Sequence, residues 1–249
     1  HVMLKSLFLN NPNEIFAIYL LHTSLKPAEL RELDAFIRFH GSTLIVMRVA
    51  ADRFADAPLV FHYTREMYFR LLAPWLLPEN LDRILYLDPD ILILNSVRTL
   101  YTTDIDRFLY AAAYHNKLTI KNINRIRLYP YEIDAYYNSG VLLMNLKALR
   151  REVREEDIYR FVRENRPKLV MPDQDILNSL YARRIRRLDE LYYNYDARYY
   201  SYYKRTSNGR FDMDRIINRT VVLHFCGRKK PWNKNYAGIF LALYKHYEK

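Results

Sequence analysis

Apolar and polar residues form two alternating patterns along this chain. Several continuous apolar runs of strand length alternate with segments whose apolar residues recur at helical spacing. The predicted strands are Ile15–His22, Thr43–Val49, Ile84–Leu87, Ile91–Leu94, Leu109–Tyr114, Gly140–Leu146, Arg186–Leu188 and Val221–Phe225. The predicted helices are Met3–Leu9, Pro27–Phe39, Tyr63–Leu77, Arg150–Arg163 and Asp175–Ala182. This order predicts an α/β fold with a mostly parallel sheet and helices on both faces.

Proline and glycine mark several of these boundaries. Pro27 stands in the first turn of its helix, and Gly41 follows the end of that helix. Pro74 is expected to interrupt the helix predicted for Tyr63–Leu77, because proline lacks the amide hydrogen that an inner turn needs. Neither an internal repeat nor a low-complexity linker divides the sequence, so residues 1–249 are predicted to form a single domain.

The composition favours a globular cytoplasmic protein. Half of the 249 residues are apolar and five are glycine, which is typical of a chain with a substantial core. No apolar run approaches the ~20 residues of a membrane helix, and His1–Lys5 does not begin a signal peptide. The single cysteine, Cys226, excludes an internal disulfide and fits a reducing compartment.

The formal net charge of +11 leaves the class of partner open. It suits nucleic acid, an anionic membrane surface or a phosphate-rich small substrate. The basic residues occur in short groups such as Arg183–Arg187 and Arg228–Lys230, and they form no long uninterrupted arm. Most of them are interpreted as a solvated basic surface.

The strongest chemical signal is the stretch RILYLDPDILILN at Arg83–Asn95. Two carboxylates, Asp88 and Asp90, lie between two apolar runs, so they are expected at the exposed end of a buried strand. Alternating residues of an extended chain point to the same side, and Pro89 restricts its own φ angle, so both carboxylates can converge on one cation. The alternative is an ordinary turn, for which Asp-Pro-Asp is equally suitable. In an open α/β sheet, ligands bind outside the carboxyl ends of strands, where this pair is expected.

Polar residues at three further positions suggest a ligand pocket, although each has a structural alternative. Arg70 suits a bidentate contact to phosphate or carboxylate, or it is a surface arginine. The triplet NSG that begins at Asn138 is either a turn or a place where the Asn138 amide contacts a hydroxylated ligand. In the sequence DQD at 173–175, one aspartate is expected to cap the following helix. The carboxylate and amide of Asp173 and Gln174 together suit sugar hydroxyls.

The stretch HFCGRKKPW, from His224 to Trp232, follows the last predicted strand. His224 offers a nitrogen ligand, Gly227 permits close approach of the backbone, and Lys230 offers a point charge to phosphate. A single histidine at a strand end is more often structural. The combined spacing of these three residues favours a site.

Seven tyrosines occur in the stretch LYYNYDARYYSYY at Leu191–Tyr203. Aromatic rings stack on sugars or bases, but tyrosines also close α/β cores with the hydroxyl at the surface. Core and surface packing is the favoured interpretation, because no spacing within the group singles out a pocket.

Taken together, the blocks YFRLLAPWLLP, YLDPDILIL, YNSGVLLMNL, PDQDILN and HFCGRKKPW resemble those of family 8 glycosyltransferases, in the same order. The chain looks like a bacterial member, of the type that includes lipopolysaccharide galactosyltransferases and glycogenin-like enzymes. The blocks run from about Arg70 to Trp232, and the combination is highly specific although each block alone is weak. The resemblance implies a GT-A, Rossmann-like fold, a donor that is usually a UDP-sugar, and transfer of a hexose with retention of anomeric configuration. It also implies Mn²⁺, with Mg²⁺ as the alternative.

The resemblance assigns roles by matching position. Asp88 and Asp90 look like the metal-binding D-x-D pair, and His224 looks like the third protein ligand. Gly227 and Lys230 look like contacts to the diphosphate. The remaining matching residues look like contacts to the donor sugar, with Gln174 near the anomeric carbon; they are Arg70, Asn138, Asp173 and Gln174. Asp173 is the candidate nucleophile if the reaction is a double displacement.

One feature departs from the family pattern. Family members usually begin with a strand and a short acidic turn that hold the uracil and ribose, just before the helix that His1–Leu9 resembles. That stretch is absent from this sequence. A truncated chain is the favoured explanation over weakened nucleotide affinity, because a sheet without its first strand would expose a central edge.

Three alternatives remain at this stage. A haloacid-dehalogenase-like phosphatase also uses Asp-x-Asp, but the further motifs of that class are not found in suitable order. A non-catalytic basic module for nucleic acid or anionic membrane explains the charge but not the polar groups at strand ends. A degenerate family member would bind UDP-sugars without transferring them. The argument against this alternative is that the chain retains Asp88, Asp90, His224 and Lys230. The favoured acceptor is a glycan or a lipid-linked precursor at the inner face of the membrane, where the positive charge suits peripheral attachment.

Overall fold

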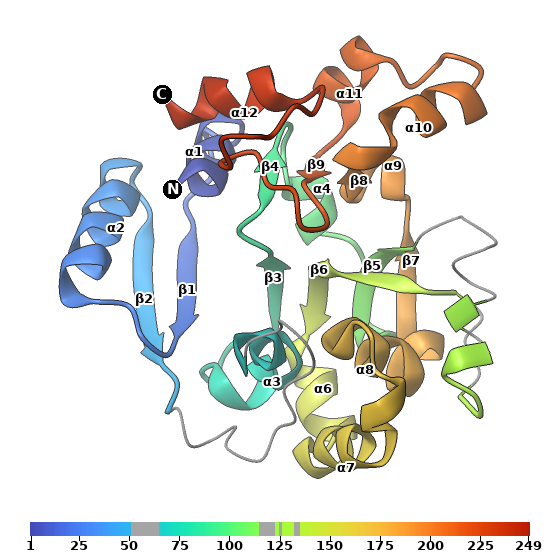
Figure 1. Cartoon of the computed structure of the whole chain (residues 1–249). Coiled ribbons are helices and arrows are strands. Elements are labelled where there is room, and N and C mark those ends of the chain that lie inside the picture. The colour runs from blue at the N-terminus through green and yellow to red at the C-terminus, as the bar shows by residue number, and fades with distance from the viewer. Residues whose placement is uncertain (51–64, 115–122, 125, 132–134) are drawn as a thin grey trace. The chain divides into compact units, whose positions relative to one another are not determined.

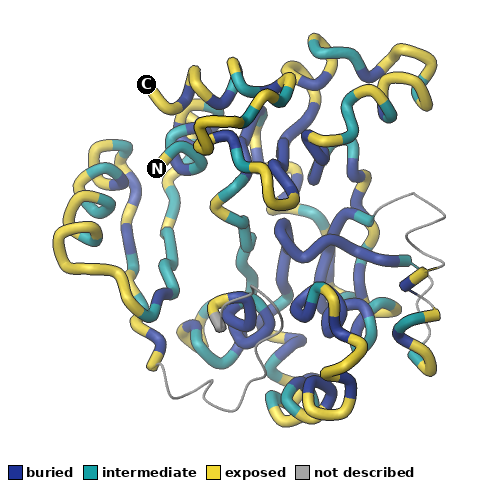
Figure 2. The backbone as a smooth tube through the Cα atoms, in the orientation of Figure 1, coloured by how far each residue is buried: buried dark blue, intermediate teal, exposed yellow. Residues whose placement is uncertain are grey.

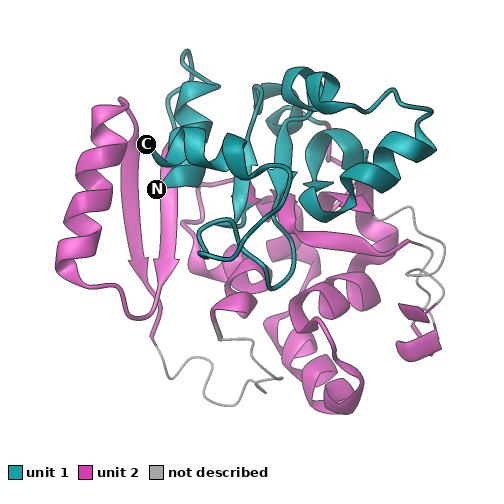
Figure 3. Ribbon diagram, turned by 45° about the horizontal axis from the view of Figure 1, so that its top comes forward, with its two compact units in different colours: residues 1–16, 87–103, 188–249 teal, residues 17–86, 104–187 magenta. Residues whose placement is uncertain are grey.

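The computed structural model describes residues 1–50, 65–114, 123–124, 126–131 and 135–249. The chain forms two compact units, each assembled from segments far apart in sequence (Figure 3). Unit 1 comprises residues 1–16, 87–103 and 188–249, and unit 2 comprises residues 17–86 and 104–187. The prediction of a single domain over residues 1–249 stays a prediction.

Unit 2 contains a β–α–β arrangement near the start of the chain (Figure 1). Strand β1 (Ala17–His22) pairs in parallel with β2 (Thr43–Arg48), and helix α2 (Pro27–Phe39) connects them and packs on β2. The Lys26 amide donates to the Glu29 carboxylate at 2.7 Å, and proline opens the helix, so the first turn is well capped. Gly41, at φ +71°, turns the chain after the helix, as its position in the sequence predicts.

The larger sheet of unit 2 carries most of its core. It has the order β3 (Arg83–Leu87), β6 (Tyr137–Asn145), β5 (Tyr110–Tyr114) and β7 (Ile185–Leu188), with β5 and β6 antiparallel. Residues 137–144 of β6 are all buried, and Figure 2 shows this strand in dark blue. The helical elements of this unit are η2 (Arg65–Tyr68), α3 (Phe69–Leu76), α6 (Leu146–Glu152), α7 (Glu155–Asn165), η3 (Arg166–Lys168), α8 (Pro172–Tyr181) and η4 (Ala182–Arg184). Helix α8 packs against β6, and α3 packs against α6 and α8.

Unit 1 is built around a smaller sheet in the order β4 (Ile91–Ile93), β9 (Val222–His224) and β8 (Tyr195–Asp196). Strands β4 and β9 are antiparallel, and β8 and β9 are parallel. The helical elements are α1 (Val2–Leu9), α4 (Arg98–Tyr101), α9 (Glu190–Tyr193), η5 (Ala197–Tyr199), α10 (Tyr200–Thr206), α11 (Met213–Arg219) and α12 (Leu241–Glu248). Helix α1 packs against β4 and α12.

Side chains of α1 and of the residue after it satisfy the outer backbone groups of β4. The Ile93 amide donates to the Ser6 hydroxyl at 2.9 Å, and the Asn10 amide group donates to the Ile93 carbonyl at 2.9 Å. Asn10 also donates to the Tyr247 hydroxyl at 2.8 Å, which connects α12 to the same point. Buried peptide groups on a strand edge need such partners.

The tyrosines of Leu191–Tyr203 pack within unit 1. Tyr195 and Tyr203 are buried, and the other five are partly buried. Tyr195 contacts Tyr203 and Phe240 through their rings, with centroids 4.8 and 6.0 Å apart. These contacts support the core-packing interpretation of this stretch.

The structure confirms the α/β class and shows where local predictions were wrong. Helix α3 continues through Pro74 and ends at Leu76, where the Arg150 guanidinium binds the carbonyls of Pro74 and Leu77. The helix predicted at Arg150–Arg163 is two helices, because Val153 and Arg154 are extended between them. Residues 63 and 64 of the predicted Tyr63–Leu77 helix lie outside the described residues.

The NSG triplet is strand and not turn, because β6 begins three residues earlier than predicted. The Asn178 side chain, from α8, takes the place of a neighbouring strand at this point. It accepts from the Tyr137 amide at 2.7 Å and donates to the Tyr137 carbonyl at 2.8 Å. Both groups are buried. The side chain therefore pairs peptide groups that would otherwise be unsatisfied.

We expect Asn178→Ala to lower the free energy of unfolding by about 2–4 kcal/mol, because it leaves two buried peptide groups unpaired. Urea denaturation followed by circular dichroism measures this change. Asn80→Ala, at an exposed position, is the matched control and should change stability by less than about 0.5 kcal/mol. Equal effects of the two substitutions would contradict the assigned role of Asn178.

Candidate functional site

Asp88, Asp90 and His224 come together in unit 1. One ligand atom from each lies within 4.8 Å of the others. The Nε2 atom of His224 is 3.2 Å from a carboxylate oxygen of Asp90 and 4.0 Å from one of Asp88. The side chains are 17%, 13% and 5% exposed for Asp88, Asp90 and His224. The predicted ligand trio is therefore a real cluster.

The pairing of β4 with β9 creates this cluster. Ile91 is opposite His224 in the antiparallel ladder, and the Phe225 amide donates to the Asp90 carbonyl at 3.0 Å. Asp90 is therefore held beside the end of β9 by backbone hydrogen bonds. Residues 134 positions apart in sequence meet because of this register.

The donor set suits a divalent cation of the Mn²⁺ or Mg²⁺ type. Carboxylate oxygens are the preferred ligands of these ions, and an imidazole nitrogen favours Mn²⁺ over Mg²⁺. Three protein ligands also leave coordination positions for substrate oxygens. The residues present therefore fit the metal that the resemblance implies.

The charges around Asp90 shift its pKa and that of His224. Burial raises the pKa of Asp90, but hydrogen bonds and positive charge from His224 and Lys230 outweigh this and hold the pKa well below its ordinary value. Burial lowers the pKa of His224, whereas Cys226 and Asp90 raise it, and the pKa ends well above its ordinary value. Burial also raises the pKa of the Cys226 thiol.

Lys230 and Gly227 lie in the loop that follows β9. The Lys230 ammonium group donates to Asp90 and, at 2.9 Å, to the Phe225 carbonyl. Gly227 has φ +83°, and a Cβ atom there would lie 2.8 Å from Nη1 of Arg198. The positive φ angle favours glycine at 227, and a Cβ atom there would also require the Arg198 side chain to shift.

Arg198 was not predicted from the sequence. Its guanidinium binds the fully buried Asp196 carboxylate, with the shortest contact at 2.6 Å. Asp196 is opposite His224 in the parallel pairing of β8 with β9. An aspartate two residues before an arginine is too common to be a sequence signal. Only the pairing of β8 with β9 shows that this ion pair lies beside His224.

A second group of predicted residues converges around Ser139 in unit 2. The Arg70 guanidinium donates to the Ser139 carbonyl at 3.0 Å and lies 3.1 Å from the Asp173 carboxylate. The Ser139 hydroxyl donates to Asp173 at 2.8 Å, and the Ser139 amide donates to the Gln174 side-chain oxygen at 3.4 Å. Asn138 is the adjacent residue, and its side-chain oxygen accepts from the Gly140 amide at 2.7 Å.

Neither aspartate of the DQD sequence is the N-cap of α8, so that prediction was wrong. The N-cap residue is Met171, and no side chain caps it. Asp175 lies inside the helix, where it accepts from Arg127 and Tyr136 and from the Val170 and Met171 amides. Pro172 at the first helical position moves the start of the helix ahead of both aspartates.

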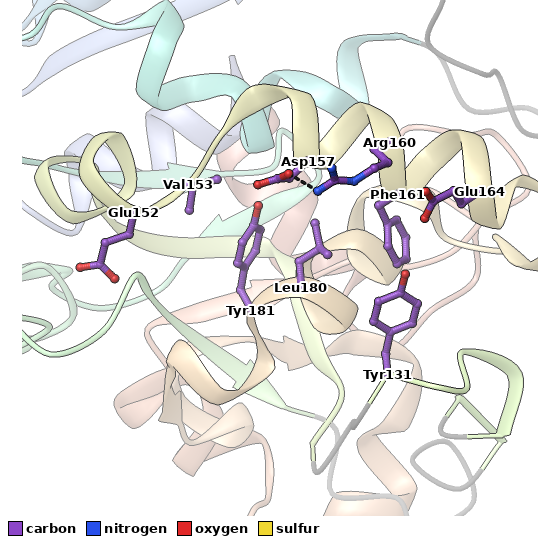
Figure 4. Close-up of a pocket in the computed structure, with 9 residues that line it drawn as sticks. All are labelled: Tyr131, Glu152, Val153, Asp157, Arg160, Phe161, Glu164, Leu180 and Tyr181. Atoms are coloured by element: carbon purple, nitrogen blue, oxygen red, sulfur yellow. Dashed lines mark hydrogen bonds and ion pairs between the residues drawn. The ribbon is translucent and has the colours of Figure 1, made fainter.

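The structure also contains a cavity of about 370 Å³ in unit 2 (Figure 4). Its lining residues are Tyr131, Glu152, Val153, Asp157, Arg160, Phe161, Glu164, Leu180 and Tyr181, none of which is a predicted site residue. Arg160 forms an ion pair with Asp157 at its wall. We assign no function to this cavity.

Comparison with known proteins identifies the family. The family model described as Glycosyl transferase family 8 matches residues 1–236. The chain belongs to glycosyl transferase family 8. This confirms the resemblance drawn from the sequence blocks, and it shows that the protein is a glycosyltransferase and not a phosphatase or a non-catalytic basic module.

Relatives of this family 8 member include lipopolysaccharide enzymes. General stress protein A of Bacillus subtilis (strain 168) is 26% identical over 241 residues, which cover 92% of this chain and 81% of that protein. The lipopolysaccharide 1,2-glucosyltransferase of Escherichia coli (strain K12) is 25% identical over 245 residues, covering 94% and 68%. The lipopolysaccharide 1,3-galactosyltransferase of Salmonella typhimurium is 22% identical over 247 residues, covering 93% and 68%.

A solved structure supports the fold of this family 8 glycosyltransferase. The galactosyltransferase LgtC, crystallised with donor and acceptor sugar analogs, superposes with a TM-score of 0.82 at 24% identity. The match covers 99% of this chain and 89% of LgtC. The predicted GT-A fold is therefore confirmed.

We expect Asp90→Asn to destabilise the metal-free enzyme by about 1–3 kcal/mol near neutral pH, the range for a hydrogen-bonded charged group. Because the folded-state pKa of Asp90 is lowered, its contribution is fully present above the ordinary value of about 3.9 and is lost as pH falls through the folded-state pKa. Urea unfolding in EDTA from pH 7 to pH 3 should show the difference between wild type and variant shrink toward acid.

Asp106→Asn, at an exposed position in unit 2, is the control for this series. Its difference from wild type should stay below about 0.5 kcal/mol throughout. A difference for Asp90→Asn that grows toward acid would contradict the assigned ion pairs.

Proposed function

We propose that this enzyme transfers a hexose, glucose or galactose, from a UDP-sugar to a glycan or lipid-linked acceptor with retention of anomeric configuration. The observation that carries the proposal is the cluster of Asp88, Asp90 and His224 in a member of glycosyl transferase family 8. Relatives that are named as lipopolysaccharide galactosyl- and glucosyltransferases support the sugar and acceptor classes.

Asp88, Asp90 and His224 would hold Mn²⁺, with Mg²⁺ as the alternative. When bound, this ion would stabilise the negative charge that develops on the leaving diphosphate. Lys230 supplies a positive charge to the same region, and its flexible side chain can exchange the Asp90 carboxylate for a phosphate oxygen. The Gly227 amide is proposed as a further hydrogen-bond donor to the diphosphate.

Arg70, Asn138, Asp173 and Gln174 are proposed to bind the donor sugar. Their contacts around Ser139 support this role, because buried hydrogen bonds fix the orientations of the side chains before substrate arrives. Gln174 is proposed to lie near the anomeric carbon. Ser139, the middle residue of the NSG triplet, orients Asp173 and Gln174 together.

The contacts of Asp173 favour a front-face mechanism over a double displacement. Its carboxylate accepts a hydrogen bond from Ser139 and is paired with Arg70, and both contacts stabilise the ionised carboxylate and weaken it as a nucleophile. In the front-face mechanism, the acceptor hydroxyl attacks the anomeric carbon from the face that UDP leaves. A phosphate oxygen of UDP takes the hydroxyl proton, so no side-chain base is required.

We expect the purified enzyme to release UDP slowly from one member of a UDP-sugar panel with Mn²⁺, and to lose this activity in EDTA. Asp90→Asn should lower the rate about 100-fold or more, because metal stabilisation of the leaving group is worth several kcal/mol. Gln174→Ala should lower the rate without weakening Mn²⁺ binding. A coupled UDP assay and Mn²⁺ titration measure these effects, with Asp106→Asn as the control.

Release of UDP that is unaffected by EDTA and by Asp90→Asn would overturn the metal assignment. Failure of every UDP-sugar to react or to bind would overturn the donor assignment.

Membrane contact is proposed from charge alone. Among the described residues, no helix has the length and apolar character to cross a bilayer. The net charge of +11 suits peripheral binding to an anionic surface. We expect the protein to float with anionic vesicles at low salt and not with neutral vesicles, and sedimentation without either kind of vesicle would contradict this contact.

A further inference from the structure

Asn194 is a buried amide that contacts the imidazole of the metal site. It follows α9 directly, is 1% exposed, and its Oδ1 atom lies 2.8 Å from Nδ1 of His224. A polar side chain at this depth needs a hydrogen-bonding reason to be there.

Backbone contacts hold Asn194 and His224 in a fixed relation. The Asn194 amide donates to the Glu190 carbonyl at 3.1 Å, and the Val221 amide donates to the Tyr192 carbonyl at 2.7 Å. Strand β8 then runs parallel to β9, with Tyr195 opposite Leu223. The pairing of β8 with β9 therefore sets the positions of the amide and the ring, and the pairing of β4 with β9 places the same ring beside Asp90.

The two ring nitrogens of His224 face different partners. Nε2 faces the Asp90 and Asp88 carboxylates, at 3.2 and 4.0 Å, and Nδ1 faces Asn194. A cation can use Nε2 only if that atom carries no proton, so the ring proton must lie on Nδ1. A proton on buried Nδ1 requires an acceptor, and the Asn194 oxygen is in position to accept it.

The orientation of the Asn194 amide decides which ring nitrogen can carry the proton. Its Nδ2 atom makes no hydrogen bond among the described residues, so the contact with the His224 ring is the hydrogen bond of this side chain. The reverse orientation would place Nδ2 against Nδ1 and force the ring proton onto Nε2. That tautomer would direct a hydrogen toward Asp90 and block metal ligation.

We propose that Asn194 is a positioning residue that keeps the His224 proton on Nδ1 and so presents a free Nε2 lone pair to the metal. Histidine ligands are commonly oriented by an acceptor at the second ring nitrogen. The neighbouring Cys226 thiol is a weaker acceptor than an amide oxygen. This inference rests on the proposed metal site.

The test is the dissociation constant of Mn²⁺ alone, measured from the electron paramagnetic resonance signal of the free ion. Asn194→Leu removes the acceptor at similar volume and should weaken Mn²⁺ binding about 10–100-fold. Asn194→Asp keeps an acceptor of the same shape and has no donor when ionised, so it should bind Mn²⁺ within a few-fold of wild type.

Asn165→Leu is the matched control. Asn165 is also a buried amide, and it donates to the Phe161 carbonyl and the Tyr131 hydroxyl in unit 2. Its loss should lower stability and leave Mn²⁺ affinity unchanged. Circular dichroism at the titration temperature establishes that each variant is folded.

Two results would overturn the inference while leaving the metal site intact. One is wild-type affinity in folded Asn194→Leu. The other is a loss of Mn²⁺ affinity in Asn194→Asp as large as that in Asn194→Leu, since the acceptor oxygen would then be irrelevant. Wild-type protein that binds no Mn²⁺ would instead overturn the proposed metal site, and the inference with it.

Discussion

The antiparallel register of β4 and β9 is the constraint on which the metal-binding end of unit 1 depends. It places Asp90 beside His224 and brings Lys230 back to the same carboxylate. Asp88 and Asp90 repel each other, so a buried site of this kind requires positive charge nearby. His224 and Lys230 provide that charge in the metal-free protein, and a divalent ion would replace part of it. A shift of the register by one residue would turn Asp90 away from His224.

The surroundings of this cluster explain why several uncharged residues matter. Side chains of α1 and Asn10 satisfy the outer edge of β4, and α9 is bonded to the chain just before β9. These hydrogen bonds hold the strand that follows Asp90 and the strand that carries His224 in place. Binding of a metal or diphosphate then requires little reorganisation of the protein, which favours both affinity and rate.

In unit 2, buried hydrogen bonds likewise hold the side chains that are proposed to bind the donor sugar. Ser139 lies in a fully buried strand segment, and its backbone and hydroxyl bind Arg70, Asp173 and Gln174. Asn178 and Asp175 fix α8 from the other side, through Tyr137, Tyr136 and Arg127. A polar network buried to this extent is stable only when its members are paired, so the contacts around Ser139 and the packing of α8 are coupled.

The sequence by itself determined the α/β class, the positions of most strands and of several helices, and the family. Apolar periodicity reports burial locally, and the acidic pair and the HFCGRKKPW stretch carry their chemistry in adjacent residues. Local predictions were wrong at α3, which continues past Pro74, and at the NSG triplet, which lies in β6 where the Asn178 side chain pairs with Tyr137. No role for Asn194 or Ser139 was predicted from the sequence, because their side-chain partners His224 and Gln174 are 30 and 35 residues away. The closeness of Arg198 to Gly227, 29 residues further on, was equally hidden. Only the tertiary structure decided these contacts, since a hydrogen bond between distant segments exists only once strand pairing and register have brought its two atoms together.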